Sequence, residues 1–203
     1  MKAEAFAQRC PKTAALLAGA VGEVFPSYAV GVSVGGHEWL GAGGAARVES
    51  FFDLASLTKV ASTTTLLALL AQDGKLSVDA RLADFYPGFS DKRVKLAHLL
   101  DHSSGFPWWL PLHAQFHLDK NPGPFDPAKT PGEARAYYEK AILESFNPAE
   151  FERQAVYSDL GFLLLGWLLE KIGGAPLDAL FQKRVAEGLR LPSLRYLPLG
   201  RSK

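Results

Sequence analysis

The feature that most constrains this chain is a long apolar segment with a serine and a lysine at its start. The segment runs from Val60 to Ala71, and Asp73-Gly74 closes it. Being apolar nearly all round, it predicts a helix at the centre of a core, from about residue 56 to residue 74. Ser56 and Lys59 stand three residues apart, so on a helix their side chains lie on one face and can meet. A lysine at the entrance of a buried helix calls for an explanation.

This Ser-x-x-Lys pair has a catalytic and a structural reading. In the first, free backbone N–H groups and the positive end of the helix dipole favour an alkoxide on Ser56 in the first turn. Desolvation would then lower the pKa of Lys59 until its amine accepts the hydroxyl proton. In the second, Ser56 caps the helix and Lys59 is solvated. Spacing alone does not separate them; the apolar helix behind the pair favours the first.

The composition indicates a folded chain that lacks the excess positive charge needed to bind polyanions. The sequence has 203 residues, enough for one good-sized domain or two small lobes, and 48% are apolar, so a core is available. The formal net charge is +1 and no basic run occurs, which argues against nucleic acid and against an electrostatic membrane patch. The single cysteine, Cys10, excludes an internal disulfide.

No apolar stretch reaches the length of a transmembrane helix. Residues 63–65, all threonine, interrupt one of the longest stretches, and Gly161 and Gly166 interrupt another. Residues 13–24 make a poor signal peptide, because the stretch is short, contains Glu23 and runs straight into a strand pattern. We therefore expect a cytoplasmic protein without a membrane segment, or a periplasmic or secreted one if a leader has been removed.

The remaining pattern predicts a helix, a hairpin and then a long helical region. Gly35-Gly36 between two short apolar runs predicts the hairpin turn. Thr130-Pro131-Gly132-Glu133 is a capping box that opens a helix. Beyond the central helix, the expected elements are helices at 13–24, 79–86 (or a turn), 94–100, 131–145, 160–172 and 177–187, strands at 28–34 and 38–42, a loop over 106–129 and an extended exit over 189–199.

This order of elements predicts a single α/β (α+β) domain. Residues 1–60 would form the N-terminal part of an α/β lobe and the start of the helix that carries Ser56. Residues 61–190 would form a mainly helical lobe, and residues 191–203 an exit segment.

A second reactive cluster opens the other apolar helix, at 160–172. Tyr157 and Asp159 stand at its start, as Ser56 and Lys59 do on the first. If the two helices pack side by side, both clusters can face one cleft. Tyr157 or Lys59 would then be the general base, the same group would protonate the leaving group, and the backbone N–H of Ser56 would be one oxyanion donor.

Five segments in a fixed order carry a resemblance. They are Phe51–Lys59, Asp73–Ser77, Leu99–Gly105, Tyr157-Ser158-Asp159 and Leu164-Leu165-Gly166. Together they resemble the serine β-lactamase-like family, and more narrowly its branch of class C β-lactamases, DD-peptidases and family VIII esterases. The similarity spans about residues 14–199. It implies a β-lactamase/transpeptidase-like fold, in which a helical lobe packs on an antiparallel sheet.

The resemblance also implies roles for individual residues. Ser56 would be the acylated nucleophile, Lys59 its proton partner and Tyr157 the second base. Asp159 occupies the third place of a Tyr-x-Asn motif, where asparagine is commoner, and its charge would keep Lys59 protonated and place the base role on Tyr157. The turn that contains His102 and Ser104 would shape the site without reacting.

Other aromatic and histidine residues leave alternatives open. Trp108 and Trp109 either line the substrate pocket or pin the long loop. His113 and His117 are four residues apart, which suits zinc on a helix, but no third ligand is evident. We therefore predict neither a metal nor a cofactor.

The third motif of the family, Lys-Thr-Gly or a His-x-Gly variant, does not occur between Tyr157 and Lys203. The resemblance therefore covers the N-terminal portion of a relative, and the sheet strands that follow there are missing. We expect a truncated chain, or one whose sheet is completed by a second polypeptide or by self-association. Two functions follow: a serine acyl hydrolase acting on a β-lactam, a D-alanyl peptide or an ester, or a non-catalytic binding or sensor module.

Overall fold

The structure is a computed structural model, and it describes residues 4–112 and 131–197. The chain divides into two compact units, Met1–Asp53 and Leu54–Lys203. Ser56 and Tyr157, with the residues around them, belong to the second unit.

The first unit contains two short helices and a hairpin, α1 (Glu4–Arg9), α2 (Pro11–Ala20), β1 (Ser27–Val34) and β2 (His37–Gly44). The sequence did not predict α1. The helix predicted over 13–24 has wrong bounds, because Pro11 occupies a favoured first helical position and the chain turns after residue 20. Gly22, with a φ of +87°, permits this turn.

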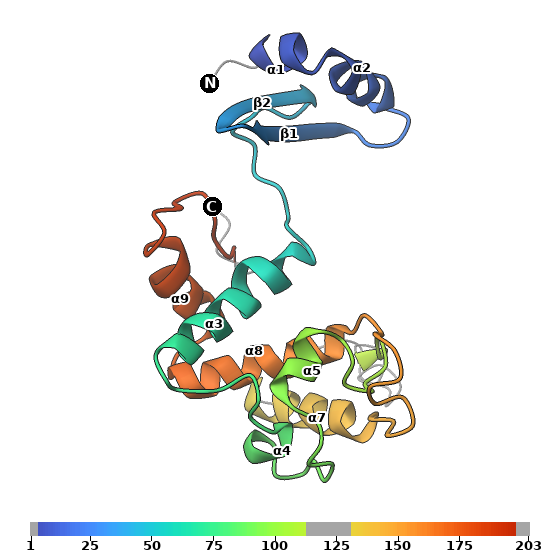
Figure 1. Cartoon of the computed structure of the whole chain (residues 1–203), viewed down its shortest axis with the longest axis vertical. Coiled ribbons are helices and arrows are strands. Elements are labelled where there is room, and N and C mark those ends of the chain that lie inside the picture. The colour runs from blue at the N-terminus through green and yellow to red at the C-terminus, as the bar shows by residue number, and fades with distance from the viewer. Residues whose placement is uncertain (1–3, 113–130, 198–203) are drawn as a thin grey trace. The chain divides into compact units, whose positions relative to one another are not determined.

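The predicted hairpin is confirmed, and both strands are longer than expected. β1 and β2 pair antiparallel from Val34↔His37 to Ser27↔Gly44 (Figure 1). Gly35 and Gly36 both have positive φ, the geometry of a two-residue hairpin turn. Gly41 leaves room for α1, since a Cβ there would lie 2.5 Å from the ring of Phe6, which is only 2% exposed.

The helix predicted over 56–74 differs from its prediction in type and in burial, because its start is exposed, with Val60 67% exposed, rather than at the centre of the core. A turn over 55–56 is followed by a π-helix, η1 (Lys59–Thr64), which continues into α3 (Thr65–Gln72). The wider π turn occurs where the Thr65 hydroxyl donates to the Val60 carbonyl at 2.9 Å. π-helical turns are rare and often accompany functional sites.

The other helices of the second unit surround the second apolar helix, α8 (Asp159–Gly173). They are α4 (Leu82–Phe85), α5 (Leu96–Leu100), α7 (Pro131–Glu144) and α9 (Leu177–Phe181), which continues into the π-helix η2 (Gln182–Ala186). The predicted helices are thus confirmed as elements, except that the one over 177–187 divides into α9 and η2. Residues 189–190 and 192–193 lie in turns, and no residue of 189–197 belongs to a strand.

The core of this unit forms around α8, as its apolar sequence predicts. α8 contacts α5, α9, η1 and α3 (Figure 1). The N-cap of α8 is Ser158, and Gly174 ends the helix in the left-handed conformation. The fully buried side chains include Leu66, Leu67, Leu82, Leu96, Leu99, Phe106, Ile142, Leu160, Leu164, Leu165, Leu168 and Leu169.

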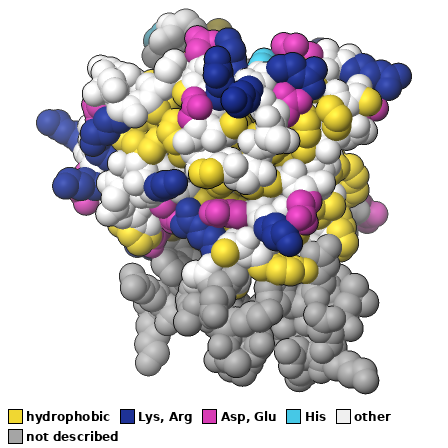
Figure 2. Space-filling model, turned by 90° about the horizontal axis from the view of Figure 1, so that it is seen from below, with side chains coloured by type: hydrophobic (Ala, Val, Ile, Leu, Met, Phe, Trp, Pro, Cys, Tyr) yellow, Lys and Arg dark blue, Asp and Glu magenta, His cyan; other side chains and the backbone are white. Residues whose placement is uncertain are grey.

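The described surface mixes charges of both signs. On the face that Figure 2 shows, basic and acidic side chains lie next to one another with apolar side chains between them. Among the described residues no single helix has the length and apolarity needed to cross a membrane. The bent pair Asp159–Gly173 and Leu177–Ala186, with 71° between its helices, meets that criterion only when both helices are counted together.

Candidate active site

Ser56 lies in a tight turn immediately before the helical residues. The preceding residue, Ala55, has a φ of +44°, in the left-handed region that a non-glycine residue seldom occupies. Backbone N–H groups of residues 57, 58 and 59 then donate to the carbonyls three residues back. Such strain costs free energy and concentrates at functional sites, where the surrounding structure maintains it. The turn leaves Ser56 exposed rather than buried in the helix.

Lys59 joins the two predicted clusters. Its Nζ lies 3.3 Å from Ser56 Oγ and 2.6 Å from Asp159 Oδ1. The Lys59 side chain is 16% exposed and that of Asp159 is 48% exposed. Ser56 and Asp159 are thus linked through one ammonium group, although they are far apart in the sequence. The structure brings the two clusters together, as the packing of the two apolar helices predicts.

The phenol of Tyr157 completes this group. Lys59 Nζ lies 4.9 Å from the centroid of the Tyr157 ring. Hydrogen bonding to Ser56, and then to Lys59, lowers the pKa of the Tyr157 hydroxyl from its ordinary value. The nearby positive charge of Lys59 acts in the same direction. A phenol with a lowered pKa next to a serine hydroxyl is suited to accept its proton.

The ammonium group of Lys59 is held in its charged form. Desolvation, the largest single influence, lowers the pKa of Lys59, but hydrogen bonds and charges from Asp159 and Tyr157 together raise it above its ordinary value. The lowered pKa considered for Ser56 and Lys59 by themselves is therefore wrong, whereas the effect expected of Asp159, which is to keep Lys59 protonated, agrees with this direction. Burial does act in the expected direction, but the carboxylate partner outweighs it.

His102 holds the segment that carries Tyr157. The backbone of His102 has a φ of +64°, and its carbonyl accepts the N–H of Val156 at 2.9 Å. Its Nδ1 accepts the N–H of Ser158 at 3.0 Å, and its ring lies 4.7 Å from that of Tyr157. Desolvation first, and the charge of Lys59 second, lower the pKa of His102, so the neutral imidazole that accepts this hydrogen bond is favoured.

Sequence reasoning missed Ser158, which is 1% exposed. Its hydroxyl donates to the Pro107 carbonyl at 2.7 Å and accepts the N–H of Gly161 at 3.4 Å. The signal that could have found it is a serine directly before an apolar helix, the common N-cap pattern. It also missed Phe162, whose ring centroid lies 5.7 Å from Lys59 Nζ.

The two tryptophans have different positions. The Trp108 carbonyl accepts the N–H of Asp159 at 3.0 Å, so this residue fixes the loop to the start of α8 while its side chain is 65% exposed. Trp109 lines the cavity next to Ser56. Ser104 is 1% exposed and is not one of the residues that line this cavity.

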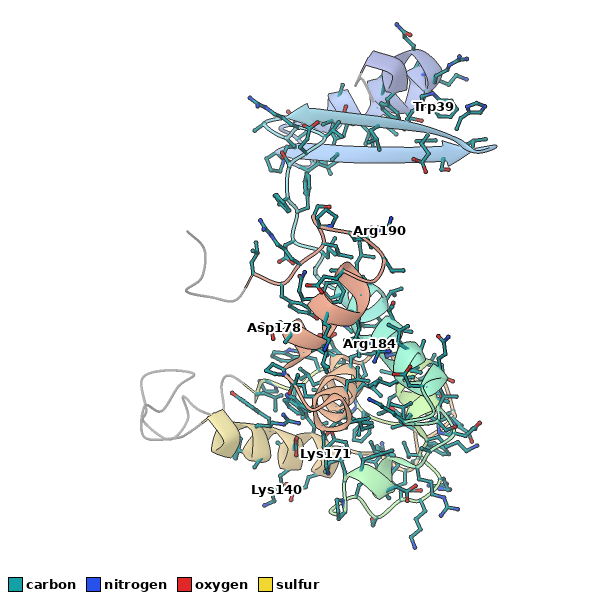
Figure 3. All side chains as sticks on the ribbon, turned by 90° about the vertical axis from the view of Figure 1, so that its left-hand side faces the viewer. Trp39, Lys140, Lys171, Asp178, Arg184 and Arg190 are labelled. Carbon is teal, nitrogen blue, oxygen red and sulfur yellow. The ribbon has the colours of Figure 1, made fainter. Side chains whose placement is uncertain are left out.

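A cavity of about 720 Å³ opens next to the reactive group, within the size range of small-molecule sites. Ser56, Lys59 and Asp159 lie in its wall, and α8 provides Phe162, Leu163 and Gly166. A larger cavity, of about 1190 Å³, lies elsewhere in the unit, and Lys140 of α7 and Lys171 of α8 line it (Figure 3). None of the predicted site residues lines that larger cavity, so we place the candidate site at the smaller one.

No metal site is evident in residues 4–112 and 131–197. No group of three or more His, Cys, Asp or Glu side chains there is placed to hold an ion. The pair His113 and His117, considered from the sequence, lies outside the described residues.

The chain matches one family model and several known proteins. The family model described as Beta-lactamase matches residues 13–198. N-acetylmuramyl-L-alanine amidase of Bacillus subtilis (strain 168) is 31% identical over 169 residues, which are 75% of this chain and 35% of that protein. A putative D-alanyl-D-alanine carboxypeptidase of Escherichia coli (strain K12) is 30% identical over 168 residues, 76% of this chain and 36% of that protein.

A solved structure matches over most of this chain. The class C beta lactamase from Rhodobacter sphaeroides has a TM-score of 0.64 and 25% sequence identity, and the match covers 88% of this chain and 48% of that one. The chain therefore spans less than half the length of the proteins with which it is compared here.

Proposed function

Since the chain belongs to the Beta-lactamase family, we propose that it is a serine acyl hydrolase that forms an acyl-enzyme on Ser56. The observation that carries this proposal is the position of Lys59 Nζ, 3.3 Å from Ser56 Oγ and 2.6 Å from Asp159 Oδ1. The Tyr157 phenol, with its lowered pKa, lies beside them. A nucleophile, a base and a fixed cation are thus within reach of one another.

In the proposed mechanism Tyr157 is the base. Its phenolate takes the proton of the Ser56 hydroxyl while Oγ forms a bond to the substrate carbonyl carbon. The Ser56 backbone N–H is one donor to the oxyanion that develops. When the intermediate collapses, the bond to the leaving group breaks and Tyr157 returns the proton to that group. A water molecule then attacks the acyl-enzyme by the same route, which releases the acid and restores Ser56.

Lys59 has an electrostatic part in this proposal. Because Asp159 keeps it charged, its ammonium group stabilises the Tyr157 phenolate and directs a hydrogen bond to Ser56 Oγ. The substrate would be a β-lactam, a D-alanyl peptide or an ester. The two curated relatives are named as an amidase and a putative carboxypeptidase, which supports acyl transfer as the reaction class.

The second candidate is a non-catalytic binding or sensor module of the same fold. For residues 1–203 taken by themselves it is favoured because no Lys-Thr-Gly motif lies between Tyr157 and Lys203 to add an oxyanion donor and part of the substrate site. A fluorescent penicillin and a fluorophosphonate probe separate the candidates. Labelling with turnover supports the hydrolase, labelling without turnover supports the sensor, and no labelling by either probe contradicts both.

We expect Asp159→Asn to move the acid limb of the acylation rate to lower pH. The Asp159 carboxylate raises the pKa of Lys59 and also opposes ionisation of Tyr157. Its removal therefore lets both groups lose a proton at lower pH. The measurement is the rate of labelling as a function of pH. Asp79→Asn, which breaks an exposed 2.8 Å pair with Lys95, is the matched control and should leave the profile in place. If the acid limb of the pH–rate profile of Asp159→Asn stays in place or moves to higher pH, the roles assigned to Tyr157 and Lys59 are contradicted.

We also expect the chain of 203 residues to turn over substrate slowly by itself. The described sheet has two strands, both with unpaired edges, and a hairpin of this size is marginal without further packing. Absence of one oxyanion donor costs about 10²–10³ in rate. The test is turnover of a chromogenic cephalosporin and a 4-nitrophenyl ester, together with the mass of the protein in solution. A monomer as fast as a relative that has the third motif contradicts this expectation.

A further inference from the structure

The cavity next to Ser56 is apolar over most of its wall. Beyond the reactive group, Trp109, Leu110 and Leu112 come from one segment, and Phe162 and Leu163 come from α8. Binding of an apolar group to such a wall is favourable, because water is released from both apolar surfaces. With about 720 Å³, the cavity has room for an aromatic ring or a medium-length aliphatic chain.

The charged residues in this wall offer nothing to an anionic group. Among the described residues that line the cavity, Lys59 is the only cation, and it already binds Asp159 at 2.6 Å. The remaining charged residue is Glu170. One of its carboxylate oxygens accepts from Arg135 at 2.9 Å and the other accepts the Leu177 N–H at 2.9 Å.

The charges of this wall are therefore already neutralised within the protein. The Asp159 carboxylate pairs with Lys59, and the Glu170 carboxylate pairs with Arg135. A substrate carboxylate placed here would lose water and would find, among the described residues of the wall, no cation that is not already paired. An uncharged apolar group would contact the apolar side chains of the wall without this cost.

We propose that this cavity receives the acyl half of the substrate and selects an uncharged, apolar acyl group over an anionic one. The inference rests on the proposed function, because the acyl group is placed by its bond to Ser56. It names a substrate class that the reaction type alone leaves open.

The test compares two esters that share one leaving group. 4-Nitrophenyl hexanoate carries an uncharged acyl chain, and mono-4-nitrophenyl glutarate carries a chain of similar length that ends in a carboxylate. We expect Ser56 in the full chain to be acylated by the hexanoate at least about tenfold faster, the scale expected of an unfavourable charge. Release of 4-nitrophenol gives the two rates, and intact-protein mass identifies the acyl group on the chain.

A variant with a new cation in the wall should narrow this difference. Leu163→Lys places an amine where α8 faces the cavity, and the relative rate for the glutarate should rise about two- to fivefold, as for an exposed ion pair. Leu163→Gln is the control for lost apolar surface. Gln182→Lys in η2 adds the same charge outside the cavity wall. Neither control should raise the relative rate for the glutarate.

The outcomes separate this inference from the proposed function. If Ser56 is acylated by both esters at equal rates, or faster by the glutarate, the proposed function stands and the selectivity is overturned. If Leu163→Lys leaves the ratio unchanged, the cavity does not hold the acyl group. If neither ester nor a fluorophosphonate modifies Ser56, the proposed function fails, and this inference fails with it.

Discussion

Ser56→Ala will abolish covalent labelling of the chain by acylating probes. The substitution removes the oxygen that would form the acyl bond, and among the described residues it is the Ser56 hydroxyl that hydrogen-bonds to Lys59 and lies beside Tyr157. Ser56 is exposed, so its loss removes no buried packing and the far-ultraviolet circular dichroism should be unchanged. The measurement is fluorescence of the labelled band after incubation with a fluorescent penicillin or a fluorophosphonate.

A matched serine makes this result specific. Ser90 is also exposed and lies outside the cavity next to Ser56. Ser90→Ala should label as the parent does. Undiminished labelling of Ser56→Ala would remove Ser56 from the mechanism, and equal loss in both variants would indicate a change in folding rather than in chemistry.

Lys59→Ala and Tyr157→Phe will each slow acylation by about 10²–10⁴-fold, the usual contribution of general acid–base catalysis. Tyr157→Phe removes the hydroxyl that accepts the serine proton. Lys59→Ala removes the charge that lowers the pKa of that hydroxyl and breaks the 2.6 Å pair with Asp159. Single-turnover labelling rates at saturating probe give both effects.

The double variant tests whether the two residues serve one proton path. Its rate should fall by less than the product of the single effects, since each substitution already disables the same step. Tyr137→Phe and Lys140→Ala, both exposed on α7, are matched controls that should label at the parent rate. If Tyr157→Phe acylates at the parent rate, the tyrosine only packs against His102.

The family and the fold were predictable because they are carried by local patterns. The five segments from Phe51 to Gly166 occur in the expected order, and the match to residues 13–198 confirms the family they indicated. α8 was predicted closely for a similar reason. A largely apolar stretch that Gly173-Gly174 closes indicates it within one short part of the chain.

Predictions that depended on helix type or on bounds were less accurate. The sequence indicated an α-helix from about residue 56, whereas the structure has a turn and then the π-helix Lys59–Thr64. Apolar periodicity does not distinguish an α-helix from a short π turn, because the two differ by one hydrogen-bond step within the same buried segment. The extra helix α1 lacked a cap or an apolar run long enough to predict it.

The sequence by itself determined which groups are available for chemistry and how Ser56 is spaced from Lys59, because that spacing lies within one turn. The sequence suggested that Asp159 would keep Lys59 protonated, but only the tertiary structure shows that the two groups pair. Asp159 belongs to another helix, and the opposing effects of burial and pairing depend on the distance between them. The tertiary structure also decided that Trp109 lines the cavity while Trp108 fixes the loop, and that His102 holds Ser158. Each of these contacts joins residues that are distant in the sequence, and a pattern of neighbouring residues carries no information about such distances.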